Sequence, residues 1–416
     1  MGQHYLQQKN DTLSIHEALE IIRENLPRAT SESLFLEKAI GRYLAEDIYA
    51  PEPSPRYTNS AMDGFAVRWQ DILAVTEDHS VALRVIGESQ AGDQFAGIVG
   101  AGEAVRISTG AVLADGCDTV VRVEDTEEKD GSIHIRHVRA QGQDIRHRGE
   151  EFEQGELLLS RGARVNAAAA ALLAGAGVAK LNVYKPCRVA ILVTGSELVS
   201  VGEEIADDQI RDSNMIMLKA ALQEAGAEVV RSIRVTDDAL ATQRAIEETV
   251  ADIVICSGGI SVGRHDHVKK AAVDCGYTPL FWRILQKPGK PLYFARKGDM
   301  LLFGLPGNPV SAFMCFTHYV KPLIAALNGV AFGWPMISAE ASDDIANQGK
   351  RPNMVRVKLQ WRPNSGYSIS HAARQGSHML TSLTRADGYI ILQPGQVVGR
   401  GERIDVYRYE FLREPI

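Results

Sequence analysis

The chain has 416 residues, of which 45% are hydrophobic and 23% are charged. This length predicts roughly two to four domains, and the ordinary globular composition excludes wholesale disorder. The formal net charge is −7, from 45 Lys and Arg against 52 Asp and Glu. That balance argues against a nucleic-acid-binding protein, which needs a broad basic face, but it leaves room for one local pocket for a small anion.

The ends and the cysteines of the chain predict a cytoplasmic protein without a membrane segment. No apolar run reaches the roughly 18 residues of a membrane helix, and MGQHYLQQKN at the N-terminus lacks the pattern of a secretory signal. The five cysteines are scattered and contain no C-x-x-C pair. This pattern is typical of a reducing compartment and argues against a disulfide framework or a zinc knuckle.

The first 50 residues predict short helices. SIHEALEIIRENL (14–26) has helical spacing of apolar residues, with a capping box from Ser14 to Glu17 and an end at Pro27. A further short helix is expected at 34–39. The prolines at 51, 53 and 55 then mark a boundary, because alternating prolines continue neither a helix nor a central strand.

The next sections predict a β module inserted into a discontinuous N-terminal domain. Short β-branched runs from about 56 to 143 indicate a small all-β fold. An alanine-rich helix follows at 166–174, capped by Asn166 and ended at Gly175. We expect residues 1–50 and 144–185 to form the N-terminal domain and residues 51–143 to form the inserted module.

Residues 186–330 predict a doubly wound α/β domain. RVAILVTG, EVVRSIRV, DIVICSGG and MLLFGLPGNP resemble buried strands, and helical patterns such as SNMIMLKAALQEAG alternate with them. Residues 331–416 return to short strands, which predict a C-terminal β-barrel-like module. The expected fold class is α/β multidomain: a doubly wound domain, a discontinuous N-terminal α+β part, an inserted β module and a C-terminal β module.

Five segments that follow or adjoin the α/β strands have the chemistry of an anion or metal site. They are TGSEL (194–198), VTDD (235–238), SGGISVGRHDH (257–267), QKPGKP (286–291) and LPGNP (305–309). Because right-handed crossovers bring the carboxyl ends of parallel strands to one edge, we expect these loops to share a ligand-binding rim.

Glycines and lysines in these segments indicate phosphate or oxyanion binding. Gly258 and Gly259 permit a nest of backbone N–H groups. In LPGNP, an asparagine can cap the next helix and the proline after it suits the first helical position, which leaves a helix N-terminus directed at the rim. Lys287 and Lys290 supply charge for an oxyanion.

Three acids lie just past the strands, and together they could hold Mg²⁺ against a phosphate: Glu197, Asp237 and Asp266. Taken singly, each motif has a simpler interpretation, since a Gly-Gly pair is commonly a turn, Asn-Pro commonly a cap and a lone glutamate commonly a solvated residue. His265 and His267 flank Asp266, but such neighbours do not share a helix face, which disfavours a histidine metal site. The hypothesis depends on the segments meeting at one edge.

Taken together, the motifs resemble the molybdopterin molybdenumtransferase family, which includes the bacterial MoeA proteins and the gephyrin E domain. The match runs from about residue 11 to the C-terminus through SAMDGFA, RISTGA, DIRHRGEEF, VTGSEL, SGGISVG, KPGKP, LPGNPVSA and GSHML, in the family's order. The resemblance implies that molybdate is inserted into the dithiolene of adenylylated molybdopterin. AMP is released in this last step of molybdenum cofactor biosynthesis, which depends on a divalent cation, expected to be Mg²⁺.

The resemblance also implies partners and architecture. It implies a homodimer that acts on small-molecule substrates, with other molybdenum cofactor biosynthesis proteins as further partners. The active cleft is expected between the α/β domain of one subunit and the inserted β module of the other, and the N-terminal domain is expected to serve dimerisation.

Site residues follow from the resemblance, position by position. The catalytic residues are expected to be Asp63, Thr109, Glu197, Asp237 and Asp266, the last three also holding the metal. The substrate-binding residues are expected to be Arg146, Glu151, Ser257, Gly258, Gly259, Ser261, Lys287, Lys290, Pro306, Gly307, Asn308, Pro309, Arg356 and Ser377. Four of these, Lys287, Lys290, Arg356 and Ser377, are expected to form the oxyanion pocket for molybdate. Glu151 stands where many members have Asp.

Two other functions fit parts of the chain. A molybdopterin adenylyltransferase shares SGG-type and LPGNP-like loops, but it is a short single-domain protein without SAMDGFA. A non-catalytic scaffold is the second alternative, because the gephyrin branch also anchors membrane receptors. The retained acids and lysines disfavour a purely structural role.

Overall fold

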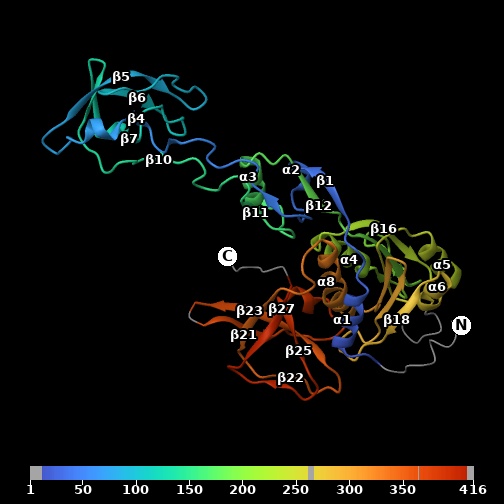
Figure 1. Cartoon of the computed structure of the whole chain (residues 1–416). Coiled ribbons are helices and arrows are strands. Elements are labelled where there is room, and N and C mark those ends of the chain that lie inside the picture. Colours follow the sequence, from blue (N-terminus) through green and yellow to red (C-terminus); the bar gives the residue numbers. More distant parts are fainter. Residues whose placement is uncertain (1–11, 261–266, 364, 410–416) are drawn as a thin grey trace. The chain divides into compact units, whose positions relative to one another are not determined.

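The computed structural model describes residues 12–260, 267–363 and 365–409 (Figure 1). The chain forms two compact units. One comprises the described parts of Met1–Ser33, Arg42–Ala45 and Asn182–Ile416, and the other comprises Leu34–Gly41 and Glu46–Leu181. The division into four domains predicted above is finer than these two units, and it stays a prediction.

The smaller unit is built on a six-stranded sheet with the order β7-β4-β6-β5-β9-β8. Its strands are β4 (Gly64–Val67), β5 (Val81–Ser89), β6 (Glu103–Ile107), β7 (Thr119–Arg122), β8 (Thr126–Lys129) and β9 (Ser132–Ile135). Phe65, Leu83, Val121 and Ile133 fill the core on one face. Gly64 is required where β4 meets β7, because a Cβ there would lie 2.1 Å from Val121 O.

Short elements complete this unit and correct two predicted helix boundaries. They are α2 (Leu36–Ala39), β2 (Ile48–Tyr49), β3 (Asn59–Ser60), β10 (Ile145–Arg146), β11 (Leu157–Leu159) and α3 (Ala167–Gly175). The helix expected at 34–39 begins only at Leu36, because Leu34 and Phe35 belong to β1 (Ser31–Phe35), which pairs with β12 (Lys180–Tyr184). Asn166 caps α3 as predicted, but Gly175 is still helical and the left-handed glycine is Gly177.

The α/β domain of the larger unit has a six-stranded sheet with the order β16-β13-β17-β20-β19-β18. The strands are β13 (Arg188–Thr194), β16 (Glu228–Val235), β17 (Ile253–Ser257), β18 (Thr278–Trp282), β19 (Tyr293–Lys297) and β20 (Met300–Leu305). The first four in this order are parallel, whereas β19 runs antiparallel to both β20 and β18.

Helices cover both faces of this sheet, as the doubly wound prediction requires. One face carries α1 (Ile15–Glu24), α4 (Ser213–Glu224), α7 (Pro309–Cys315) and α8 (Lys321–Leu327), and the other carries α5 (Ala239–Glu247) and α6 (Val268–Asp274). The strands are apolar throughout because alternate residues face opposite layers. Ile253 and Ile255 join the first layer, and Val254 and Cys256 join the second.

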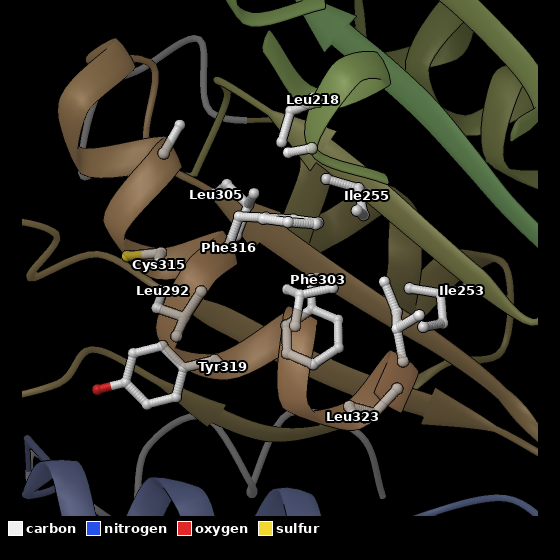
Figure 2. Packing of buried hydrophobic residues seen from close by; sticks show 14 of the residues in the cluster. Leu218, Ile253, Ile255, Leu292, Phe303, Leu305, Cys315, Phe316, Tyr319 and Leu323 are labelled. Carbon is white, nitrogen blue, oxygen red and sulfur yellow. The ribbon is translucent and has the colours of Figure 1, made fainter. Parts of the chain in front are cut away.

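The long apolar helix from α7 to α8 packs against the centre of the sheet. Figure 2 shows Phe316 and Leu323 of this helix beside Ile255 and Phe303 of the strands. Among the described residues, Pro309–Leu327 is the one helix long and apolar enough to cross a membrane, and 78% of its apolar window is buried in the fold. A search for uninterrupted apolar runs misses it, because polar residues such as Thr317 and His318 lie within it.

The C-terminal module is a closed barrel with the order β21-β24-β23-β25-β27. Its strands are β21 (Met336–Ala341), β23 (Asn353–Arg362), β24 (Gly366–His371), β25 (Gly388–Leu392) and β27 (Arg403–Arg408), and β22 (Ile345–Ala346) pairs with β26 (Val397–Val398) beside it. The side chains of β23 alternate. Val355 and Val357 fill the barrel, whereas Met354 joins the α/β core. Residue 356 therefore faces the α/β domain rather than the barrel interior.

Candidate functional site

The structure places the described parts of all five predicted segments at one edge of the α/β sheet. TGSEL, VTDD, SGG and LPGNP follow the carboxyl ends of the parallel strands β13, β16, β17 and β20. The fifth segment, QKPGKP, precedes the antiparallel strand β19. The first residue of β19, Tyr293, pairs with Gly304 near the end of β20, so this loop lies at the same edge. We call this edge the rim.

Two of the three predicted metal ligands lie on adjacent strand ends of the rim. Glu197 is exposed, and Asp237 is half-buried. Reciprocal hydrogen bonds join their loops, because Ser196 N donates to Asp237 Oδ2 and Asp237 N donates to Ser196 Oγ. Asp266 and Ser261 lie outside the described residues. Within the described ranges no three acid, histidine or cysteine side chains come together as a metal cluster.

The predicted glycine nest is left-handed at both residues. Gly258 has φ +91° and Gly259 has φ +65°. A Cβ on Gly258 would lie 2.6 Å from Thr194 O, so no other residue fits there without displacing the backbone. Beside the nest, Thr194 Oγ1 is buried and has no hydrogen-bond partner among the residues the structure describes. Thr194 was not among the predicted site residues.

In the LPGNP loop, Asn308 occupies the N-cap of α7 and Pro309 the first helical position. The predicted cap is wrong in one respect, because the Asn308 side chain makes no capping hydrogen bond. Val310 N instead donates to Ser377 O at 3.2 Å, which ties the helix start to the C-terminal module. Gly307 and Asn308 are exposed at the rim.

A residue that the sequence did not indicate joins two of the loops. Asn214 Nδ2 donates to Ser257 Oγ at 2.9 Å and to Gly307 O at 2.8 Å. Asn214 is buried, and its Oδ1 has no partner among the described residues. Ser257 in turn donates to Pro306 O at 3.4 Å. The only sequence signal for Asn214 is its place at the start of a capped helix.

The KPGKP loop is fixed through its backbone, and its lysines are exposed. Lys287 N donates to Pro352 O and Lys287 O accepts from Met354 N, both at 2.8 Å, so the loop is fastened to the start of β23. A Cβ on Gly289 would lie 2.4 Å from Cys315 Sγ, which keeps the loop against α7. Neither Lys287 nor Lys290 forms an ion pair with a described residue.

Arg356 is a buried cation without an acidic partner. It is 1% exposed, and its Nε and Nη2 have no hydrogen-bond partner in the described part of the chain. Burial lowers the pKa of its guanidinium. Its backbone is clamped on both sides by Gln375, at 3.1 and 2.9 Å. Because an unpaired buried charge costs several kcal/mol, the site fits an anionic ligand.

The remaining predicted residues belong to the smaller unit. Asp63 is exposed, and its Oδ1 accepts from Thr109 N at 2.7 Å and from Thr109 Oγ1 at 2.9 Å. These two bonds lower the pKa of Asp63. Arg146, in β10, and Glu151 are also exposed, and Glu151 accepts a hydrogen bond from Ser54 Oγ at 2.7 Å.

Comparison with known proteins assigns the chain to a family. The chain is 34% identical over 408 residues to the molybdopterin molybdenumtransferase of Haemophilus influenzae, covering 96% of this chain and 99% of that protein. The chain belongs to the MoeA family of molybdopterin molybdenumtransferases. A relative of the same name in Nostoc is 34% identical, covering 92% of this chain and 90% of that protein.

Matches to family models and to a solved structure confirm the MoeA assignment and the α/β multidomain fold. Residues 13–177 match the MoeA N-terminal region (domain I and II), 190–326 a probable molybdopterin binding domain and 338–409 the MoeA C-terminal region (domain IV). The crystal structure of the molybdopterin biosynthesis MoeA protein from Pyrococcus horikosii superposes with a TM-score of 0.82 at 30% identity. That comparison covers 96% of this chain and all of the other.

Proposed function

We propose that this MoeA-family chain transfers molybdenum from molybdate to adenylylated molybdopterin and releases AMP. The observation that carries the proposal is the buried guanidinium of Arg356, which has no acidic partner among the described residues and lies on the face of β23 toward the α/β domain. An uncompensated buried charge is strongly destabilising, and a bound anion would supply the missing counter-charge. Molybdate is a tetrahedral dianion and supplies it.

The groups around Arg356 suit an oxyanion. Lys287 is fastened by its backbone to Met354, two residues from Arg356 along β23. Ser377 follows the Gln375 clamp and bonds the start of α7 through its carbonyl. We assign the molybdate pocket to Lys287, Lys290, Arg356 and Ser377. In this pocket the planar guanidinium gives paired hydrogen bonds and the lysines give point charges.

The second substrate, adenylylated molybdopterin, carries phosphate groups that can bind at the neighbouring SGG and LPGNP loops. Gly258 and Gly259 form a left-handed turn at the rim, in which Gly258 N donates to Leu305 O at 3.1 Å. We therefore assign the phosphate contact to the N–H of Gly259 and to the start of α7, which adds its dipole. Two anionic substrates repel each other as they approach. Cations and N–H groups held in place beforehand offset that repulsion without reorganising during the reaction.

Mg²⁺ is the third part of the proposal. Glu197 and Asp237 are hard oxygen donors on adjacent strand ends, held together by the Ser196–Asp237 hydrogen bonds, and the donor set fits Mg²⁺. We propose that these two, with Asp266, hold the ion. When bound, Mg²⁺ would neutralise phosphate charge.

Two cysteines of the α/β domain, Cys256 and Cys315, are unsuited to forming a covalent intermediate. Cys256 and Cys315 are fully buried, and burial raises the pKa of each thiol to about 12. Such thiols remain protonated and are poor nucleophiles at neutral pH. The proposal therefore assigns catalysis to positioning and electrostatic stabilisation.

We further propose that the protein is a cytoplasmic homodimer. In this dimer the inserted β module of one subunit completes the active site on the α/β domain of the other subunit. The residues that the module contributes are Asp63, Thr109, Arg146 and Glu151.

Mixed dimers test this arrangement. Asp63→Ala and Lys290→Ala homodimers should each be inactive. A co-expressed mixture should regain part of the activity, because one of the two sites in a mixed dimer is intact. A mixture as inactive as its parents would contradict shared sites.

AMP release tests the proposed reaction. Purified full-length protein is mixed with adenylylated molybdopterin, molybdate and Mg²⁺, and AMP is quantified. We expect release that depends on molybdate and Mg²⁺. No release at any molybdate concentration would contradict the proposal. Formation of adenylylated molybdopterin from ATP would favour the adenylyltransferase alternative, and stable capture of partners without turnover would favour the scaffold.

A further inference from the structure

A cavity of about 600 Å³ lies between the α/β domain and the C-terminal module. Met217 of α4 and Phe313 of α7 line it from the α/β domain. Leu383 of α9 (Thr381–Thr384) and Tyr409 line it from the C-terminal module. Its volume falls within the range of small-molecule sites, about 300–1,000 Å³, and its walls are mainly apolar and aromatic. No residue of this cavity belongs to the predicted site.

The cavity adjoins the rim because the same segments run from one to the other. Ser213 lines the cavity, and the next residue, Asn214, donates to Gly307 O in the LPGNP loop. Phe313 lies four residues after Pro309, about one helical turn into α7. The rim and the cavity therefore share the beginnings of α4 and α7.

A second connection runs through the C-terminal module. Leu380 lines the cavity three residues after Ser377, whose carbonyl accepts from Val310 N. Ser377 belongs to the proposed molybdate pocket. Cavity and oxyanion pocket thus lie along one short segment of the chain, on the same helix start.

We propose that this cavity binds the pterin ring of the substrate, an inference that rests on the proposed function. The dithiolene that takes up molybdenum is carried by the ring fused to the pterin. The pterin must therefore lie next to the molybdate pocket, whereas adenine is separated from it by the pyrophosphate. The aromatic walls formed by Phe313 and Tyr409 suit a planar heterocycle.

The polar groups of the cavity also distinguish pterin from adenine. Asp212 and Asp387 both line it. Asp387 Oδ2 accepts from Leu359 N at 2.8 Å, and its Oδ1 has no partner among the described residues. A carboxylate accepts two parallel hydrogen bonds. The aminopyrimidinone edge of a pterin offers two adjacent donors, N–H and NH₂, whereas adenine offers a donor beside an acceptor.

One wall of the cavity is organised by an arginine. Arg211 Nη1 donates to Ser200 O at 3.2 Å, to Val201 O at 2.9 Å and to Glu203 O at 2.7 Å. These bonds fix the turn that brings Val201 to the cavity. The position of part of the apolar wall therefore depends on a polar network.

Titration of the full-length protein with neopterin, a fluorescent free pterin, tests the inference. Thr384 and Thr381 are both exposed on α9, but only Thr384 lines the cavity. We expect Thr384→Trp to weaken neopterin binding about tenfold or more by filling the cavity, and Thr381→Trp to leave it unchanged. Asp387→Asn, which keeps an acceptor for Leu359 N, should weaken binding to a similar extent.

Competition and turnover complete the test. Saturating AMP should not displace neopterin. The inference is wrong if neopterin fails to bind, if it binds Thr384→Trp and Asp387→Asn as tightly as wild type, or if AMP competes for the cavity. AMP release by the wild-type protein tests the proposed reaction independently of the pterin site, so the two proposals can fail separately. Turnover with an unchanged KM for adenylylated molybdopterin in Thr384→Trp would overturn the pterin site alone.

Discussion

Ser196 and Asp237 hold each other through two hydrogen bonds that run in opposite directions. Ser196 N donates to Asp237 Oδ2 at 3.0 Å, and Asp237 N donates to Ser196 Oγ at 3.3 Å. The residues are 41 positions apart, at the ends of the adjacent strands β13 and β16. This pair fixes the relative position of two loops that carry the proposed metal ligands.

Substitutions of Asp237 and Ser196 distinguish the effect of the Asp237 charge from the effect of the hydrogen bonds between the two loops. Asp237→Asn keeps an acceptor for Ser196 N but removes the negative charge, whereas Ser196→Ala removes only the hydroxyl. We expect Asp237→Asn to weaken AMP binding about tenfold when Mg²⁺ is present and to change it little without Mg²⁺. Ser196→Ala should have a much smaller effect. Calorimetric titration measures the AMP affinity of both variants with and without Mg²⁺. An equal loss of affinity with and without Mg²⁺ in Asp237→Asn would show that Asp237 does not hold the metal.

We expect the buried guanidinium of Arg356 to reduce the stability of the folded protein and, at the same time, to bind molybdate. Replacing an unpaired buried cation by an apolar side chain is often neutral or stabilising. We expect Arg356→Met to unfold at the same temperature as wild type or a higher one, and to lose the stabilisation that molybdate gives. Lys358→Met, an exposed position on the same strand, is the matched control and should keep that stabilisation. Thermal melts with and without molybdate measure both effects. A destabilised Arg356→Met that still responds to molybdate would identify a structural residue.

The sequence predicts the rim better than it predicts the residues behind it. Strands such as β13 and β17 are recognisable because they are apolar on both faces, and the order of motifs places their loops. Asn214 could not be predicted, because its partners lie 43 and 93 residues away along the chain. The same holds for Arg356. Resemblance indicated its role, but only the tertiary packing shows that it is buried and unpaired.

The helix predicted at 34–39 shows a different limit of sequence reasoning. Leu34 and Phe35 have apolar side chains compatible with a helix, but they pair in β1 with β12, about 145 residues further along. Strand pairing at this separation overrides a weak local preference. Asn308 shows another limit. The sequence correctly predicts that Asn308 is the N-cap residue of α7, but its side chain makes no capping hydrogen bond to the described part of the helix.

Thr109 is predicted to tune Asp63. The backbone N–H and the hydroxyl of Thr109 both bond Asp63 Oδ1 and lower its pKa. Thr109→Ala should raise that pKa and leave it below the ordinary aspartate value, because the N–H remains. Thr109→Ser should restore it. Carbon-detected NMR titration of the Asp63 carboxyl gives the values.

The sign of the Asp63 contribution follows from the direction of its shift. A carboxyl with a lowered folded-state pKa stabilises the fold above its ordinary pKa, and that stabilisation is lost as pH falls through the lowered value. Thr109→Ala should therefore reduce the pH dependence of stability in the acid range. An unchanged Asp63 pKa in Thr109→Ala would show that the hydroxyl contributes nothing.

His318 is predicted to make the fold sensitive to mild acid. It is fully buried in the α7–α8 helix, its Nδ1 lies 2.7 Å from Tyr389 Oη, and its ring stacks on Trp334. Burial lowers its pKa to about 3. Unfolded chains bind a proton below the ordinary histidine pKa of about 6.5, whereas the folded state does not, so stability falls as pH drops from there toward 3.

This effect is large enough to measure. Between pH 7 and pH 5 the loss from His318 should be about 2 kcal/mol in the free energy of unfolding. His318→Gln should show a smaller loss over that interval, and His79→Gln, at an exposed position, should behave as wild type. Urea denaturation at the two pH values gives the differences. The same pH dependence in His318→Gln and wild type would contradict a neutral buried imidazole.

We propose that a metal oxyanion binds where the rim meets the C-terminal module. Anomalous diffraction at the molybdenum absorption edge, from crystals of the full-length protein soaked in molybdate, tests it most directly. We expect one strong peak within hydrogen-bonding distance of the Arg356 guanidinium and of Ser377, and no such peak in Arg356→Met crystals. A peak bound elsewhere on the chain, with Arg356 still unpaired, would contradict it.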